Sequence, residues 1–207
     1  MRTNMKIGIT GGIGSGKSYI CNMLEAQGFP VYNCDDKAKR LMVENILIIN
    51  AIRELIGAES YMEECDNEGH VTYILNKPVI ASFLFANMDN ASKVNSIVHP
   101  VVKEDFKLWS ENQHSNIVFM ECAILFESGF QDTVDKTVLI YADENIRMHR
   151  AMKRDKSTEK QIRSRMSHQI SGDEAVRRAD YVLNHNDYCT TEDEVQKMIN
   201  WIKNTTL

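Results

Sequence analysis

The stretch GGIGSGKS, residues 11–18, decides the fold, because it matches the pattern G-x-x-x-x-G-K-[ST] at every position. Glycines at this spacing let the backbone curl so that successive N–H groups point inward at a phosphate. In this pattern the lysine, here Lys17, reaches the β- and γ-phosphates, and the Ser18 hydroxyl ligates Mg²⁺. The sequence therefore predicts a loop that binds the phosphates of ATP beside a magnesium ion, through Gly12, Ile13, Gly14, Ser15, Gly16, Lys17, Ser18 and Tyr19.

The residues on either side of this loop support the same interpretation. Residues 6–10 read as a short buried strand and residues 17–27 as a helix. The loop therefore joins a strand to the positive end of a helix dipole, whereas a merely flexible glycine-rich turn would not need this context. Tyr19 departs from the second hydroxyl residue that often follows the motif, so at this position only its backbone N–H is expected to support the α-phosphate.

Short apolar segments alternate with helical ones over the rest of the chain. Further strands are predicted at residues 30–34, 116–123, 136–141 and 181–184, and helices at residues 35–43, 143–152 and 191–203. This alternation predicts a three-layer α/β/α fold of the P-loop NTPase type, with a five-stranded parallel sheet. At 207 residues the chain suits a single domain, with its core in residues 1–43, 115–145 and 179–207.

Two segments depart from this alternation. Residues 44–114 read as a mostly helical insertion, with helices at 45–56, 76–86, 91–98 and 101–111, an irregular acidic stretch at 57–69, and Pro78 and Pro100 as punctuation. Residues 146–178 are rich in arginine, with breaks expected at Ser157 and Gly172. They are expected to form a helical lid that closes on phosphates and excludes water.

Two carboxylates lie where chemistry is expected in such a sheet. Glu121 ends an apolar strand and would orient Mg²⁺; the alternative is an exposed acid at a strand end. Asp35 directly follows the second strand, at the sheet edge where ligands bind, and could accept a proton from an attacking hydroxyl. A simple helix N-cap explains Asp35 equally well from chemistry alone.

Composition restricts the possible partners. The net charge is -5 and the estimated pI is 5.7, which disfavours a protein that coats nucleic acid. No apolar run reaches membrane-spanning length, and the N-terminal residues lack a secretory signal, so no membrane association is expected. The five cysteines are scattered without a C-x-x-C pair, which favours neither a metal site nor a disulfide framework and suits a reducing cytoplasm.

Several motifs in the same order resemble those of the dephospho-CoA kinase family, over nearly the whole chain. The matching residues are Gly8 to Ser18 at the loop, Asn33 to Arg40 after the second strand, His99-Pro100 in the insertion, Ala123 to Glu127, Arg150, Arg154-Asp155, Arg165 and Gln169 in the lid, and Ala179 to Asn184 near the end. Some positions depart from the family pattern. Asn33 replaces an acid, Ala123 replaces a proline, Lys77 stands where arginine is frequent, and Asn184 stands one place early in the last motif.

The resemblance implies a reaction and roles for individual residues. ATP would phosphorylate the ribose 3′-hydroxyl of dephospho-CoA, giving coenzyme A and ADP, with Mg²⁺ present. Asp35 would be the catalytic carboxylate and Lys17 would act on the transferred phosphate. The resemblance also implies that the insertion at residues 44–114 binds the phosphoryl acceptor. It assigns the acceptor side to Thr10, Asp35, Arg40, His99 and Glu127, the lid over ATP to Arg147, Arg150 and Arg154, and the metal to Ser18 and Glu121.

Other classes stay open at this stage. A different small-molecule or nucleoside monophosphate kinase of the same fold is the nearest alternative. A GTPase is a weaker one: Asp66 to Gly69 fits D-x-x-G, but Asn76 to Val79 lacks the final acid of N-K-x-D. A nucleotide-binding module without catalysis is the third, and the chain is expected to be a monomer or a weak homo-oligomer.

Overall fold

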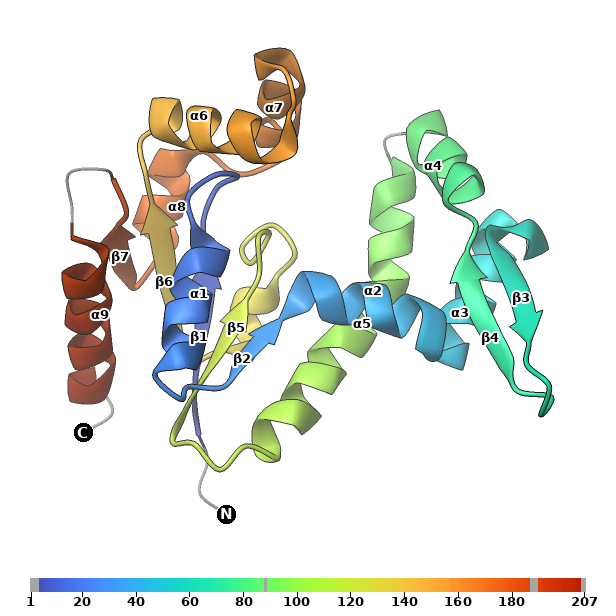
Figure 1. The fold of residues 1–207 in the computed structure, drawn as a ribbon, viewed down its shortest axis with the longest axis horizontal. Helices are drawn as coiled ribbons and strands as arrows, with labels where there is room; N and C mark the ends of the chain where they lie inside the picture. Colours follow the sequence, from blue (N-terminus) through green and yellow to red (C-terminus); the bar gives the residue numbers. More distant parts are fainter. Residues whose placement is uncertain (1–3, 88, 187–189, 206–207) are drawn as a thin grey trace. The chain divides into compact units, whose positions relative to one another are not determined.

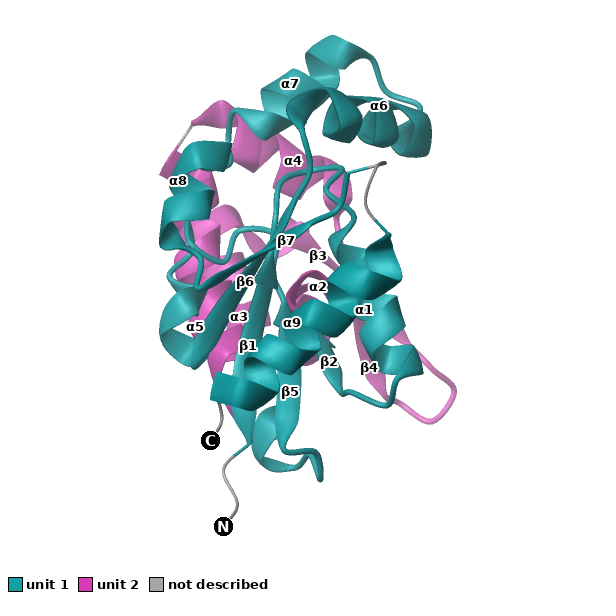
Figure 2. Cartoon of the chain, turned by 90° about the vertical axis from the view of Figure 1, so that its left-hand side faces the viewer, with its two compact units in different colours: residues 1–33, 109–207 teal, residues 34–108 magenta. Residues whose placement is uncertain are grey.

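The computed structural model describes residues 4–87, 89–186 and 190–205, which form two compact units. The first unit comprises Met1–Asn33 and Trp109–Leu207, and the second comprises Cys34–Leu108, coloured teal and magenta in Figure 2. The second unit thus begins ten residues before the expected boundary at residue 44, because the helix that carries Asp35 packs with it. Each unit is described below by itself.

The first unit is built on a five-stranded parallel sheet, as predicted (Figure 1). The strand order is β2-β5-β1-β6-β7, with bounds Val31–Asn33, Ile117–Glu121, Met5–Thr10, Lys136–Tyr141 and Tyr181–Asn184. In the register of the sheet, Ile9 and Asn33 both lie opposite Glu121, and Thr10 lies opposite Leu139. Because all strands are parallel, the ends of β1, β2 and β5 meet at one edge, where the predicted site residues follow.

Helices cover the sheet on one face through a continuous apolar core. Helix α1 (Lys17–Ala26) contributes Ile20 and Leu24, and α9 (Thr191–Thr205) contributes Met198 and Ile202. These four side chains are fully buried against β1, β5, β6 and β7. Fully burying an aliphatic side chain of this size stabilises a fold by about 1.5–3 kcal/mol, so this core fixes the strand and the helix on either side of the phosphate loop.

The other face of the sheet is covered by the segment that follows β5. Gly8 shows how closely this segment approaches, because a Cβ at Gly8 would lie 3.0 Å from Leu125. Leu125 and Phe130 are buried here, and the 3₁₀ helix η2 (Phe130–Thr133) and α8 (Gly172–Arg178) belong to the same unit. The sheet therefore has cover on both faces, in agreement with the three-layer prediction.

The arginine-rich segment forms two further helices, α6 (Glu144–Asp155) and α7 (Glu159–Met166). The break expected at Ser157 is confirmed: α6 ends at Lys156 in a left-handed conformation with φ of 50°, and Thr158 caps α7 with a reciprocal capping box. The break expected at Gly172 occurs as the start of α8, which Ser171 caps. Figure 1 shows α6 and α7 beyond the carboxyl ends of β1 and β6, on the side of the phosphate loop.

The second unit contains a β-hairpin that the sequence did not predict. Its helices are α2 (Cys34–Glu44), α3 (Ile46–Ile56), α4 (Lys77–Ala86) and α5 (Asp89–Glu111), with a 3₁₀ turn η1 (Ala58–Ser60). Strands β3 (Tyr61–Cys65) and β4 (Val71–Leu75) pair antiparallel where an irregular stretch was expected. Asp66 makes the turn, because its Oδ1 accepts from the N–H groups of Glu68 and His70 at 2.8 and 2.9 Å. The D-x-x-G match therefore closes a hairpin and is no nucleotide switch.

A second expectation, that Pro100 interrupts the helices of the insertion, is wrong. Helix α5 runs through Pro100 without a break. Val94, Val98, Val102 and Phe106 follow one another at four-residue spacing and are all buried, so one apolar face continues past the proline. Packing of this face outweighs the one backbone hydrogen bond that proline removes.

Asp180 links the starts of β6 and β7, which gives a test of the fold. Its Oδ2 accepts from both the N–H and the hydroxyl of Thr137 at 2.8 Å, and Lys136 lies 3.1 Å from its Oδ1. Burial acts to raise the pKa of Asp180, but the bonds from Thr137 and Lys136 outweigh it and hold the pKa below its ordinary value.

We predict that Asp180→Asn lowers the free energy of unfolding by about 1 kcal/mol at pH 7, measured by urea denaturation. A carboxylate with a lowered folded-state pKa stabilises the fold above its unfolded-state pKa, so the gap between variant and wild type should close as the pH falls below about 4. Asp132→Asn, at an exposed position on η2, serves as the control and should change little. Equal stability of Asp180→Asn and wild type at pH 7 would contradict this account.

Candidate active site

The phosphate loop has the backbone that its sequence predicted. Gly14 and Gly16 adopt φ angles of +79° and +96°, and the Ser15 N–H donates to the Gly12 carbonyl at 3.0 Å. Gly14 also allows a close approach, because a Cβ there would lie 2.1 Å from the carbonyl oxygen of Arg147. Any side chain at Gly14 would therefore push α6 away from the loop.

The interior of the loop is polar and suits a phosphate. Lys17 Nζ donates to the Gly11 carbonyl at 2.7 Å, so the ammonium lies across the loop. Ser15 is fully buried, and its hydroxyl has no hydrogen-bond partner among residues 4–87, 89–186 and 190–205. Helix α1 begins here without a side-chain cap, so its first N–H groups also point at the loop. A buried hydroxyl and uncapped amides are the groups that a phosphate oxygen would satisfy.

The carboxylate of Glu121 lies against the start of α1. Ser18 Oγ donates to Glu121 Oε1 at 2.8 Å, and Asn33 Nδ2 donates to Oε2 at 2.9 Å. Glu121 is only 8% exposed, so the alternative of an exposed acid at a strand end does not hold. Burial, together with the charge of Glu121, raises the pKa of the Cys21 thiol well above its ordinary value, which keeps that thiol protonated beneath the site.

The segment between α7 and α8 is bonded both to the phosphate loop and to the segment that follows β5. Gln169 Oε1 accepts from the Ile13 N–H at 2.9 Å, and Gln169 Nε2 donates to the Ala123 carbonyl at 3.0 Å. The next residue, Ile170, donates its N–H to Glu127 Oε1 at 2.9 Å. Ile13 also packs against the small apolar core of α6 and α7. The predicted lid therefore contacts the phosphate loop in this structure.

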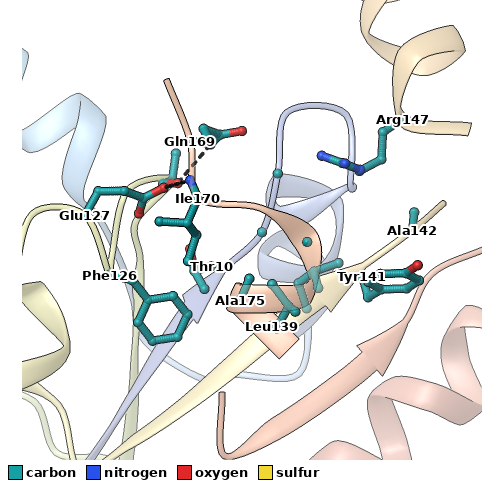
Figure 3. Close-up of a pocket in the computed structure, with 15 residues that line it drawn as sticks. Thr10, Phe126, Glu127, Leu139, Tyr141, Ala142, Arg147, Gln169, Ile170 and Ala175 are labelled. Carbon is teal, nitrogen blue, oxygen red and sulfur yellow. Dashed lines mark hydrogen bonds between the residues drawn. The ribbon is translucent and has the colours of Figure 1, made fainter. Parts of the chain in front are cut away.

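A pocket lies beneath these contacts, and Figure 3 shows its walls. Thr10 and Glu127, both predicted on the acceptor side, line it, and so do Arg147 and Gln169. Phe126, Tyr141 and Ala175 add apolar surface. Sequence reasoning did not select Tyr141 or Ala175, because each reads as an ordinary residue at the end of a strand or within a helix.

The three lid arginines have different surroundings. Arg147 lies over the loop, where a Cβ at Gly12 would meet its Nη1 at 1.9 Å. Arg150 Nη1 donates to the carbonyl of His185 at 2.9 Å. Arg154 instead forms a two-bond pair with Asp155, at 2.6 and 3.0 Å. Arg147 and Arg150 thus lie beside the loop, while Arg154 is bonded within the lid.

Three predicted residues belong to the second unit. Asp35 is exposed in the first turn of α2, and Arg40 pairs with Glu44 at 2.9 Å on the same helix. His99 is half-buried on α5, and burial, with a smaller effect of the Lys103 charge, lowers the pKa of its imidazole. His99 is therefore neutral at pH 7.

A P-loop kinase is defined by a strand, a glycine-rich loop and a helix, together with an acidic strand end and an arginine-bearing lid, and this chain has all of them. A family model described as dephospho-CoA kinase matches residues 5–191 of the chain. A dephospho-CoA kinase of Bacteroides fragilis is 43% identical over 180 residues, which cover 86% of this chain and 83% of the relative. One of Porphyromonas gingivalis is 40% identical over 77% of this chain and 75% of its own length. The chain belongs to the dephospho-CoA kinase family, and its reaction is the ATP-dependent phosphorylation of dephospho-CoA.

Solved structures agree on the fold. A Thermus thermophilus protein aligns with a TM-score of 0.79 at 24% identity, covering 99% of this chain and 98% of its own. A dephospho-CoA kinase from Campylobacter jejuni aligns with a TM-score of 0.65 at 22% identity, covering 98% of both chains. A shikimate kinase from Acinetobacter baumannii aligns at 0.55 and 16% identity, covering 100% of this chain and 97% of its own, which reflects the shared P-loop kinase fold.

The two bonds of the lid segment can be tested separately by amide hydrogen exchange. We predict that Gln169→Ala speeds exchange of the Ile13 amide about fivefold, because one hydrogen bond worth about 1 kcal/mol is lost. Glu127→Ala should speed exchange at Ile170 by a similar factor and leave Ile13 unchanged. The two variants are each other's control, and an identical exchange pattern in both would contradict the assignment.

Proposed function

We propose that the chain transfers the γ-phosphoryl group of ATP to the ribose 3′-hydroxyl of dephospho-CoA, with the donor held by the loop at residues 11–18 and Asp35 as the catalytic base. The observation that carries this proposal is the contact of Ser18 with Glu121 beside Lys17, in a chain of this family. Such a grouping serves phosphoryl transfer, because it concentrates positive charge and metal-binding oxygens at the phosphates.

The ATP side of the proposal rests on the loop and on the lid. The N–H groups of residues 12–19 would hold the phosphates, and Lys17 would leave the Gly11 carbonyl to reach the β- and γ-phosphates. Arg147 lies against the glycines of the loop and Arg150 is bonded to His185, and both would neutralise charge on the phosphates. Arg154 would take part only after its pair with Asp155 opens.

The residues present fit a magnesium ion. Among the described residues no group of three or more His, Cys, Asp or Glu side chains could hold a metal. This agrees with Mg²⁺, which is usually bound by one or two protein oxygens together with substrate phosphates and water. Ser18 Oγ and the Glu121 carboxylate, 2.8 Å apart, would supply those oxygens. Held by Ser18 and Glu121, a magnesium ion would supply positive charge that offsets the negative charge of the ATP phosphates.

The residues proposed for the acceptor are described unit by unit. In the proposal Thr10 and Glu127, which line the pocket of the first unit, and Arg40 and His99 of the second unit bind dephospho-CoA. Because His99 is neutral, it would recognise the acceptor by hydrogen bonding and not by charge. Glu127 would exchange its bond to the Ile170 N–H for one to the acceptor.

Asp35 would act on the reacting hydroxyl. It lies two residues after Asn33, whose amide is bonded to Glu121, so the chain itself connects the base to the metal-binding edge of the sheet. Phosphoryl transfer passes through a loose transition state, so Asp35 mainly orients the hydroxyl and takes its proton late. The lid at residues 146–178 would exclude water, which competes as an acceptor.

The setting of the reaction is part of the same proposal. None of the four cysteines that the structure describes forms a disulfide, and Cys189 lies outside the described residues. Reduced thiols suit a cytoplasmic enzyme. No helix in the described part of the chain is long and apolar enough to cross a membrane. In the proposal, the chain is one P-loop kinase domain with an acceptor insertion. It acts as a monomer or weak homo-oligomer and binds no nucleic acid.

A coupled assay of ADP release tests the proposed reaction. The purified chain should release ADP with dephospho-CoA and be at least a hundredfold slower with nucleoside monophosphates or sugar acids. Asp35→Asn should lower kcat by about 10²–10⁴-fold while its Kd for ADP stays within about twofold, because the base acts only on the acceptor. Asp36→Asn is the matched control: Asp36 pairs with Lys39 at 3.0 Å in solvent, and this variant should be near normal. Turnover of Asp35→Asn near the wild-type rate would remove Asp35 from the chemistry.

The magnesium assignment is tested by titrating Mg²⁺ in the same assay. We predict that Glu121→Gln raises the concentration needed for half-maximal activity about tenfold, since the amide loses the charge that attracts the metal. Its affinity for ADP in the presence of a chelator should change by no more than about twofold. Glu25→Gln, at an exposed position on α1, is the control. An unchanged Mg²⁺ requirement in Glu121→Gln would exclude this carboxylate.

A further inference from the structure

His185 is bonded to the phosphate loop, although sequence reasoning gave it no role. It follows β7, and its N–H donates to the Tyr141 carbonyl at 2.7 Å, which extends the pairing of β6 and β7 by one residue. Its Nδ1 lies 2.7 Å from the carbonyl oxygen of Ser15. We infer that His185 is a positioning residue, which turns the Ser15–Gly16 peptide so that the Gly16 N–H faces the bound phosphate.

The geometry determines where the proton of the imidazole lies. A backbone carbonyl can only accept, so Nδ1 carries the hydrogen and donates to Ser15. Arg150 Nη1 lies 3.4 Å from Nδ1. Both nitrogens carry hydrogens and neither can accept one, so this contact is not a hydrogen bond. Arg150 instead donates to the carbonyl of His185 at 2.9 Å and holds the residue from the side of α6.

The planarity of the peptide transmits this bond to the phosphate site. In a trans peptide the carbonyl of one residue and the N–H of the next point in opposite directions. Holding the Ser15 carbonyl toward His185 therefore points the Gly16 N–H to the other side, toward the interior of the loop. That N–H has no hydrogen-bond partner among the residues that the structure describes, so it is available to a ligand. A reversed peptide would present a carbonyl oxygen to the phosphate and repel it.

Two neighbours hold the imidazole in place. The ring of Tyr19 stacks on it, with centroids 5.8 Å apart and an angle of 7° between the planes. This separation suits an offset stack. On the loop side the fit is close, because a Cβ at Gly16 would lie 2.2 Å from Nδ1. Tyr19, which lacks the short hydroxyl side chain common after this motif, thus acts on the loop through His185.

The inference rests on the proposed ATP site, but its test does not need the acceptor. The measured quantity is the Kd for ADP by isothermal titration, together with the KM values for ATP and dephospho-CoA. His185→Phe keeps a ring for Tyr19 to stack on and removes the donor. It should raise the ADP Kd and the ATP KM about tenfold, as loss of one buried hydrogen bond implies. The KM for dephospho-CoA and kcat should stay within about twofold.

Conservative variants separate positioning from a structural role. His185→Asn carries a side-chain N–H close to the position of Nδ1 and should bring the ADP Kd back to within about threefold of wild type. Tyr19→Leu should give an ADP Kd about threefold higher than that of Tyr19→Phe, which keeps the ring. Because Tyr19 is 52% exposed, these variants fold even if His185→Phe does not.

Three results would overturn the inference. These are wild-type ADP affinity in a folded His185→Phe, failure of His185→Asn to recover affinity lost in His185→Phe, or equal ADP affinity of Tyr19→Leu and Tyr19→Phe. A chain that binds ADP as described but does not phosphorylate dephospho-CoA would refute the proposed reaction and leave this inference standing.

Discussion

The orientation of a few backbone N–H groups in residues 11–18 is the constraint on which the rest of the structure depends. These groups must converge on one phosphate, and a short loop holds such a shape only when both ends are fixed. The buried side chains of β1 and α1 fix the ends, and left-handed glycines supply the turns. Contacts from outside the loop then direct individual peptides: Gln169 at Ile13, Arg147 at Gly14 and His185 at Ser15.

The same edge of the sheet brings together groups of different chemical character. Glu121 is buried at the end of β5, where Asn33 and Ser18 use both of its oxygens. The Asn33 amide is noteworthy because the family pattern has an acid at this position. Here the amide donates a hydrogen bond to the Glu121 carboxylate, whereas an acid would place a second negative charge beside it. In the proposed site, the Asn33 amide therefore stands beside the Glu121 carboxylate where the family pattern would place a second acid.

The sheet and the loop were predictable from the sequence because their signals are local. Apolar strands of four to six residues and the glycine spacing identify β1, β5, β6, β7 and residues 11–18. The β3–β4 hairpin was missed because β3 is acidic and exposed and therefore has no alternating pattern. The hairpin is held instead by its turn at Asp66 and by the stacking of Arg53 on Tyr73. His185 was missed for a related reason: its role depends on a contact with Ser15, 170 positions earlier, which no local pattern records.

The bond between Ile13 and Gln169 has a consequence for the end of each catalytic cycle. When ADP departs, a buried loop amide would otherwise be left without a partner, which costs about 1–3 kcal/mol. The side-chain oxygen of Gln169 can take that amide at once, at 2.9 Å, so the empty loop keeps its shape. In the proposed cycle, nucleotide binding and release would exchange one oxygen acceptor of this amide for another. The same contact would then favour release of ADP and preserve the loop for the next ATP.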